Sequence, residues 1–460
     1  MEIFGVILSL VGLMYFAYKG VNVLVLAPLM ALFACLFQAG TPYMGVYTQV
    51  FMPALGGYLL KYFPIFLLGS IFGKFMSDSG AAEVIGQFIA GKLGSERGVL
   101  AVVLACGLLT YGGVSLFVVA FCMYPIANSL FQNGNIPKRL IPASIALGSF
   151  TFTMTSLPGT PAIQNAIPMP YFGTTAFAAP GLGMIGALVM FFSGMGWLNS
   201  RTKKAHAKGE GFGGEFVSNK VIETVTSVTF FKALCPLIIV VVLNYLFSKI
   251  FLPRFDHTYL SELKYGAVSP SQVLGLWSLI ISLTLSILIL FLIYRKQYNN
   301  ALKTLNEGTY GSLLPIFNTA SEVGYGATIA SLSSFVLIKD SVLGITPEYP
   351  LVSEAISINV LAGITGSASG GLSIALEALS ESYLSLAAAA NISPELLHRV
   401  ASMACGGFDT LPHNGAVITL LTICGLTHKK SYFDIGMVAV VFPFLATCVV
   451  ILIGTLTGSF

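Results

Sequence analysis

Residues 156–163 read SLPGTPAI, and residues 410–417, 254 positions later, read TLPHNGAV. Each stretch interrupts an apolar segment, at 139–170 and at 396–426, that is longer than the roughly 20 residues of one straight membrane crossing. Irregular backbone at membrane depth is tolerated only where it is buried in protein or lines a wet cavity. The two stretches therefore predict two discontinuous helices at corresponding places in two related halves.

Two Gly/Ser-rich centres precede these breaks. YGGVS at 111–115 lies inside the apolar region 98–132, and GSASGG at 366–371 lies inside the apolar region 350–390. A helical hairpin that enters and leaves the membrane on one side would produce such a pattern. We therefore expect one re-entrant hairpin before each discontinuous helix.

The halves share short motifs in the same order, with offsets of about 254 to 258 residues. This division predicts a first inverted repeat at 1–198, a basic, Gly-rich cytoplasmic linker at 199–229, and a second inverted repeat at 230–460. An odd number of spans, five in each half, places the second half upside down relative to the first. Inverted repeats with discontinuous helices are typical of secondary transporters.

The composition agrees with a chain surrounded by lipid. Of 460 residues, 55% are hydrophobic and 9% are charged, against about 25% charged in a soluble domain. The mean hydropathy is +0.85. We expect an all-α polytopic membrane protein of about ten transmembrane helices. The expected spans lie at 3–18, 21–37, 53–75, 139–170, 176–197, 230–251, 271–294, 312–338, 396–426 and 433–457.

The distribution of basic residues predicts the orientation. If the N-terminus lies outside, 17 of the 23 lysines and arginines fall on the inner side and six on the outer side, Arg399 among the six. This bias predicts a protein of the bacterial inner membrane with both termini in the periplasm. The lipid bilayer is the partner that these charges imply, and no nucleic-acid-binding patch is present in the sequence.

The two hairpin tips and the two breaks are expected to meet near the middle of the membrane. Half-helix N-termini there would expose unpaired N–H groups and a partial positive charge, which bind carboxylates. The side chains at these points are mostly hydroxyls and amides, which suit a small hydroxylated anion; the alternative is that each only caps or kinks its own helix. The candidate substrate-binding residues are Gly112, Gly113, Ser115, Thr155, Ser156, Gly159, Thr160, Asn165, Ser367, Ser369, Gly370, Gly371, Thr410 and Asn414.

Ionisable residues inside a membrane are costly and therefore mark function. Asp409 and His413, four positions apart around the second break, are the first candidates for proton coupling, although they could instead form a static pair that braces the break. Glu377 is a third candidate, and the alternative is that Glu377 and Glu381 form a solvated face. Glu322, inside a predicted span, is a further acidic group that the sequence does not rank against them.

Other functional classes find no support in the sequence. It contains no Gly-Lys-Ser/Thr phosphate loop, no nucleophile–base pair and no metal-ligand cluster, so we predict neither an enzyme nor a cofactor or metal. A channel is a further alternative. A cation/proton antiporter also uses broken helices, but it would favour carboxylates in both breaks, and 139–170 contains none.

Three runs resemble bacterial permeases of the GntP (gluconate permease) family: LTYGGVSLF at 109–117, FTMTSLPGTPAIQN at 152–165 and GGFDTLPHN at 406–414. The resemblance covers nearly the whole chain, and the repeat of hairpin and broken helix looks like the ion transporter superfamily. It implies proton-coupled symport of a small carboxylate by elevator-type alternating access in a homodimer, with sodium as the alternative coupling ion. Relatives carry gluconate and similar sugar acids, D-serine or 3-hydroxybutyrate. GSASGG at 366–371 departs from the Gly-Ser-Ala-Thr-Val stretch of gluconate carriers, so a 3-hydroxybutyrate-like substrate is expected at least as much as gluconate.

Overall fold

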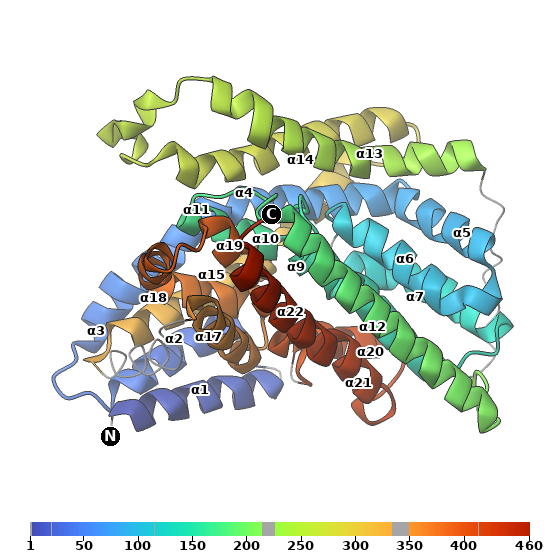
Figure 1. The fold of residues 1–460 in the computed structure, drawn as a ribbon, viewed down its shortest axis with the longest axis horizontal. Helices are drawn as coiled ribbons and strands as arrows, with labels where there is room; N and C mark the ends of the chain where they lie inside the picture. Colours follow the sequence, from blue (N-terminus) through green and yellow to red (C-terminus); the bar gives the residue numbers. More distant parts are fainter. Residues whose placement is uncertain (1, 20, 115, 214–225, 334–348, 413) are drawn as a thin grey trace.

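The structure is a computed structural model that describes residues 2–19, 21–114, 116–213, 226–333, 349–412 and 414–460. Within these ranges every regular element is a helix (Figure 1). The helices of the first half are α1 (Glu2–Tyr18), α2 (Val23–Cys35), α3 (Tyr43–Val46), α4 (Met52–Asp78), α5 (Ala81–Leu93), α6 (Gly98–Tyr111), α7 (Leu116–Asn133), α8 (Ile141–Ser149), α9 (Phe152–Thr155), α10 (Ile163–Ala166), α11 (Pro168–Phe172) and α12 (Pro180–Ala207). Those of the second half are α13 (Ser227–Leu246), α14 (Pro270–Tyr294), α15 (Ala301–Ser331), α17 (Pro350–Thr365), α18 (Ala368–Ala389), α19 (Pro394–Ala404), α20 (Gly415–Cys424), α21 (His428–Gly436) and α22 (Phe442–Thr457).

Among the described residues, five helical stretches are long and apolar enough to cross a membrane, or up to six if the bent pair formed by α5 and the helix after it is counted as one span. Helices α1, α2 and α17 contain shorter apolar stretches of 10–17 residues. These lengths confirm the prediction of an all-α, multi-spanning membrane protein. The five are Tyr43–Asp78, Pro180–Ala207, Thr229–Arg254, Pro270–Tyr294 and His428–Thr457.

Helices α4 and α15 pack against each other along their length at the centre of the fold. A Cβ added at Gly308 of α15 would lie 2.8 Å from the Cα of Ile71, so the glycine allows the two backbones to approach closely. The Ser70 hydroxyl donates to the Gly308 carbonyl over 2.7 Å at the same crossing. The α1–α2 pair packs on α15, and the α13–α14 pair packs on α4 along the upper edge of Figure 1.

The helix interruptions fall where the sequence predicts them. Helices α6 and α7 are separated at Gly112–Val114, where Gly113 has φ +94°, and α17 and α18 are separated at Gly366, which has φ +63°. The first long segment divides into α8, α9 and α10–α11 around irregular backbone at 156–162, and the second divides into α19, a short 3₁₀ turn and α20. Glycine adopts positive φ without steric cost, which explains its presence at both hairpin turns.

Some element boundaries differ from the prediction. Helix α5 was not expected, because its sequence is short and carries Glu83 and Lys92; it makes an angle of 108° with the helix that follows it. Helix α12 extends to Ala207, ten residues beyond the expected end of its span, and α15 begins at Ala301 rather than at residue 312. Part of the predicted linker, 214–225, lies outside the described residues.

The described start of the linker is anchored to the first broken helix. Glu210 accepts two hydrogen bonds from Arg139, at 2.6 Å and 3.0 Å. Arg139 also pairs with Asp434 of α21 at 2.8 Å, and Arg201 of α12 pairs with the same carboxylate at 2.7 Å. Asp434 is buried, so this cluster joins the first broken helix to the last helices of the chain.

Candidate transport cavity

A cavity of about 810 Å³ lies where the irregular segments of both halves converge. Gly113 and Val114 of the first hairpin turn and residues 366–369 of the second turn line it. The first break contributes Thr155 and residues 161–164, and the second break contributes Asp409, Thr410 and Asn414. All four irregular points, which are far apart in the sequence, therefore border one space.

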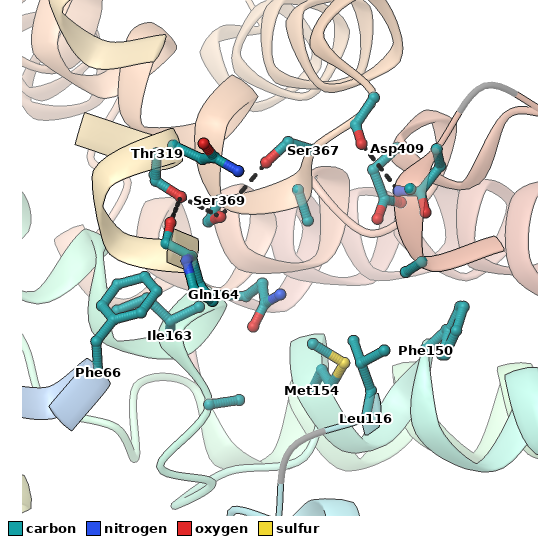
Figure 2. A pocket seen from close by; sticks show the side chains of 18 of the residues that line it. Phe66, Leu116, Phe150, Met154, Ile163, Gln164, Thr319, Ser367, Ser369 and Asp409 are labelled. Carbon is teal, nitrogen blue, oxygen red and sulfur yellow. Dashed lines mark hydrogen bonds between the residues drawn. The ribbon is translucent and has the colours of Figure 1, made fainter. Parts of the chain in front are cut away.

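The walls of the cavity differ in chemistry, as Figure 2 shows. Leu116, Met154 and Phe150 lie on one side, whereas the hydroxyls of Ser367, Ser369 and Thr319 and the carboxylate of Asp409 lie on the facing side, with Gln164 between them. The apolar wall comes from α7 and the first broken helix. The polar wall comes from α15, the second hairpin and the second break.

Five polar atoms that line the cavity are buried and have no hydrogen-bond partner within the described part of the chain. Buried polar groups in proteins are nearly always satisfied, because desolvating one without a partner costs about 1–3 kcal/mol. Their convergence on one cavity indicates a site for a polar ligand. The atoms are Thr110 Oγ1, Gln164 Oε1, Asn318 Oδ1, Glu322 Oε2 and Asp409 Oδ1.

Glu322 of α15 lies against the beginning of α18. Its side chain is buried, and a Cβ added at Gly370 would collide with its Oε2 atom. The Ser367 hydroxyl caps α18 by accepting from the Gly370 N–H over 3.1 Å. The Ser369 and Thr319 hydroxyls are 3.3 Å apart and join the same two helices. A carboxylate of the protein therefore already lies at the positive end of the second hairpin's returning helix.

The second break is tied to the second hairpin. The Asn414 side chain caps α20 by accepting from the Val417 N–H at 2.8 Å, and its Nδ2 atom donates to the Gly366 carbonyl at 2.9 Å. The Thr410 hydroxyl donates to the Ala439 carbonyl at 2.9 Å. Asp409, in the 3₁₀ turn between α19 and α20, lines the cavity and is 8% exposed, and its buried Oδ1 atom has no hydrogen-bond partner among the described residues.

The structure brings seven of the seventeen predicted residues to the cavity. Among the described residues the lining contains two carboxylates, Glu322 and Asp409, and no basic side chain. Two of the predicted residues, Ser115 and His413, lie outside the described residues. The predicted residues that line the cavity are Gly113, Thr155, Ser367, Ser369, Asp409, Thr410 and Asn414.

Other predicted residues brace the first break from behind. The Ser156 hydroxyl donates to the Gly183 carbonyl at 2.7 Å. Asn165 donates to the Thr160 and Ala176 carbonyls, both at 3.0 Å, and the Gly159 carbonyl accepts from Asn244. Ser156, Gly159, Thr160 and Asn165 therefore hold the shape of the break and do not line the cavity.

The remaining predicted residues have other surroundings. Gly112 packs against Leu237, and Gly371 packs against the backbone of Ala362. Gly370 and Gly371 lie in the first turn of α18 and not in the hairpin turn itself. Glu377 is exposed, accepts a hydrogen bond from the Tyr171 hydroxyl at 2.7 Å, and does not line the cavity.

Sequence reasoning left out several residues that line the cavity. Glu322 could have been found from the sequence, since it is the one acidic residue inside the predicted span 312–338. The sequence gives no indication that Gln164, Asn318 and Thr319 line the cavity, because their positions there depend on how α15 and the first break pack. Arg399, which the charge distribution assigns to the outer side of the membrane, has a side chain on α19 that is fully buried in the protein.

Comparisons with known proteins identify the family of the chain. A family model described as GntP family permease matches residues 1–316. An uncharacterized transporter of Bacillus subtilis (strain 168), YxjC, is 44% identical over 473 residues, an alignment that covers 100% of both chains. The chain therefore belongs to the GntP family of permeases, and it is a multi-pass membrane transporter rather than an enzyme.

Proposed function

We propose that the protein is a secondary transporter that carries a small hydroxycarboxylate together with a proton. The observation that carries the proposal is the single cavity bordered by all four irregular segments, with five buried polar atoms that have no partner among the described residues. Two of those atoms belong to carboxylates, Glu322 and Asp409, which are the groups that can take up a proton. Their charge, and not a cofactor, would couple the proton to the substrate.

The same proposal includes ten membrane spans in two inverted repeats. The packing of α1–α2 on α15 and of α13–α14 on α4 supports it, because each pair contacts the long central helix of the other half. Asn135 and Asn391, 256 positions apart, both have left-handed backbones, at φ +49° and φ +55°, just after α7 and α18. We further propose re-entrant hairpins at α6–α7 and α17–α18, an elevator-type movement and a homodimer, which rest on the family.

The contact between Glu322 and the start of α18 suggests how the proton and the anion are coupled. An ionised Glu322 occupies the positive end of the helix and repels a second carboxylate. When Glu322 takes up a proton, that repulsion disappears and the helix end becomes available to the substrate. Asp409 acts in the same way at the second break. The proton and the anion then bind together, and the loaded site has no more charge than the empty one.

The apolar wall narrows the substrate class. Leu116, Phe150 and Met154 offer no hydrogen bonds to a ligand with hydroxyls along its whole length. A short hydroxycarboxylate with an apolar end, such as 3-hydroxybutyrate, fits both walls. Gluconate has hydroxyls on every carbon of its chain and would leave several of them facing apolar side chains, which costs free energy.

The test is transport by purified protein in liposomes. Uptake of labelled 3-hydroxybutyrate and gluconate would be followed with an inward proton gradient, with and without a protonophore, and with a sodium gradient instead. Concentrative uptake that collapses with the protonophore supports proton symport. Uptake driven by a sodium gradient alone would show that sodium, and not the proton, is the coupling ion. Absence of uptake under every gradient would exclude hydroxycarboxylates as the substrate class and favour cation/proton antiport.

Replacing Asp409 with Asn tests the second carboxylate in the same liposomes. Proton-driven uptake is expected to fall, because the amide cannot exchange a proton with the cavity. Unchanged uptake by Asp409→Asn would remove Asp409 from the coupling mechanism.

A further inference from the structure

Arg399 is a buried cation without an acidic partner among the described residues. Its side chain is 0% exposed, and it is the largest of the fully buried side chains. Its hydrogen bonds go to the Ala178 and Thr155 carbonyls and to the Ser402 hydroxyl. Glu395, one turn earlier on α19, pairs with Lys249 at 3.7 Å instead.

A buried charge that lacks a counter-ion is strongly destabilising, and it is retained where it serves another purpose. Gly183 of α12 leaves space for the Arg399 side chain, because a Cβ added at Gly183 would lie 3.1 Å from the Arg399 Nε atom. The guanidinium is therefore enclosed by α12, α19 and the segment before α12. It is held in one place, so its field has a fixed direction.

The guanidinium lies directly behind the apolar wall of the cavity. It donates to the carbonyl of Thr155 over 3.3 Å, and Thr155 itself lines the cavity. Thr155 is the last residue of the four-residue α9, and its carbonyl accepts hydrogen bonds from Arg399 and Ser402. The guanidinium offsets the partial negative charge of this carbonyl oxygen, which would otherwise repel an anion in the cavity.

The charges around the cavity would otherwise disfavour an anionic substrate. Glu322 and Asp409 are both acidic, and within the described residues no basic side chain lines the space. Charges in a low-dielectric interior act over longer distances than charges at a surface, because little water or salt screens them. One fixed cation behind the first break can therefore determine where a carboxylate is held.

We propose that Arg399 is a positioning residue for the substrate: its guanidinium, fixed behind Thr155, supplies the positive potential that offsets Glu322 and Asp409 and holds the substrate's carboxylate in the cavity. The proposal rests on the carboxylate-transport function and deepens it. The two walls would then have different roles. Glu322 and Asp409 on the polar wall take up the proton, and Arg399, behind the apolar wall, attracts the anion.

The experiment measures how much the preference for an anionic over a neutral ligand depends on residue 399. Uptake of labelled 3-hydroxybutyrate into liposomes at pH 7 would be competed with unlabelled 3-hydroxybutyrate and with its neutral amide, 3-hydroxybutyramide. The ratio of the two inhibition constants reports the preference for the anion. In Arg399→Gln this ratio is expected to fall at least tenfold, because the anion loses an attraction that the amide never had.

Ser402→Ala is the matched control. It removes a 2.6 Å hydrogen bond to the same Thr155 carbonyl without removing a charge. If Arg399 acts through its charge, the ratio in Ser402→Ala stays within about twofold of the wild-type ratio. A purely structural brace of the break would make the two variants alike.

Arg399→Lys keeps the charge and loses the fork of hydrogen bonds. Its ratio is expected to stay within about threefold of wild type, and it decides the question even if Arg399→Gln does not fold. A tenfold fall in Arg399→Lys, or an unchanged ratio in Arg399→Gln, overturns the inference and leaves the transport function standing. Failure of the wild type to take up 3-hydroxybutyrate overturns the proposed function, and the inference with it.

Discussion

The first broken helix brings Phe150 and Met154 to the cavity, whereas the second brings Asp409 and Asn414. Both helices break at related sequences, and both breaks border the same space. The difference lies in the side chains that the breaks carry: apolar groups in front of a buried cation in the first, and hydrogen-bonding or ionisable groups in the second. Repeated backbone geometry can therefore serve two tasks, because the backbone makes the opening and the side chains decide what it holds.

The strongest test of this comparison is Glu322→Gln, because the neutral glutamine resembles the protonated form of Glu322 and cannot release a proton. Each pH unit is worth about 1.36 kcal/mol, so a gradient of about two units supports about hundredfold accumulation by one-to-one symport. In Glu322→Gln the accumulation ratio is expected to fall to about one, while exchange of labelled for unlabelled substrate without a gradient continues. Both quantities are measured in the same liposomes.

Glu377→Gln is the control for this prediction. Glu377 lies on the exposed face of α18, and its loss is expected to leave accumulation near the wild-type level. Accumulation by Glu322→Gln that equals that of the wild type would contradict the assignment of proton coupling to the polar wall.

A smaller effect is expected from Gly370→Ala. The added Cβ would collide with the Glu322 carboxylate, which would have to turn away from the start of α18. Overpacking of this kind costs about 1–3 kcal/mol, so substrate affinity is expected to fall about tenfold. Gly196→Ala in α12, where a Cβ would meet nothing within 4 Å, is the control. Equal affinities in the two variants would mean that the contact between Glu322 and α18 is unimportant.

On the apolar wall, Met154→Ala probes specificity. Burial of one methylene group contributes about 0.8 kcal/mol, so affinity for a substrate with a terminal methyl group is expected to fall about fourfold. Affinity for gluconate should change less, because it has no apolar end to lose the contact. Met184→Ala, at an exposed position of α12, should change neither value. A parallel loss for both substrates would show that Met154 only supports the packing of the break.

The smallest effect concerns the anchor of the first broken helix. The Arg139 guanidinium beside Glu210 lowers the pKa of that carboxyl, so the pair stabilises the fold above the pKa of the unfolded chain and ceases to do so as the pH falls through the lower, folded pKa. Because Glu210 is partly exposed, Glu210→Gln should cost less than about 1 kcal/mol at pH 7. Thermal unfolding at pH 7 and near pH 3 measures the difference, which should shrink at the lower pH. A difference that persists at pH 3 would point to a cause other than ionisation.

The fold was predictable where composition and backbone chemistry act locally. The interruptions at 112–114, 156–162 and 366–367 lie where Gly, Pro and Ser cluster, whereas single residues such as Pro64 and Pro315 lie inside continuous helices. Helix α5 was not predictable in this way, because a short amphipathic segment between Gly80 and Gly94 lacks the apolar length of a span. Its position depends on packing against its neighbours.

The site was only half predictable, because sequence identifies irregular backbone but not which side of it faces the cavity. Ser156 and Asn165 have the chemistry of ligands, yet the turn at Gly159 directs them into the supporting network. The burial of Arg399 was not predictable either. A lone arginine near a helix start is normally placed in water, and only the packing of α19 against the first break reveals that it is buried.

The size of the cavity has a thermodynamic consequence. A volume of about 810 Å³ corresponds to roughly 27 water molecules at about 30 Å³ each, many more than a four-carbon acid displaces. A transport cycle that closes this space must release most of that water. Substrate affinity should therefore respond to osmotic pressure and tighten when an impermeant solute, excluded from the cavity, lowers the activity of water.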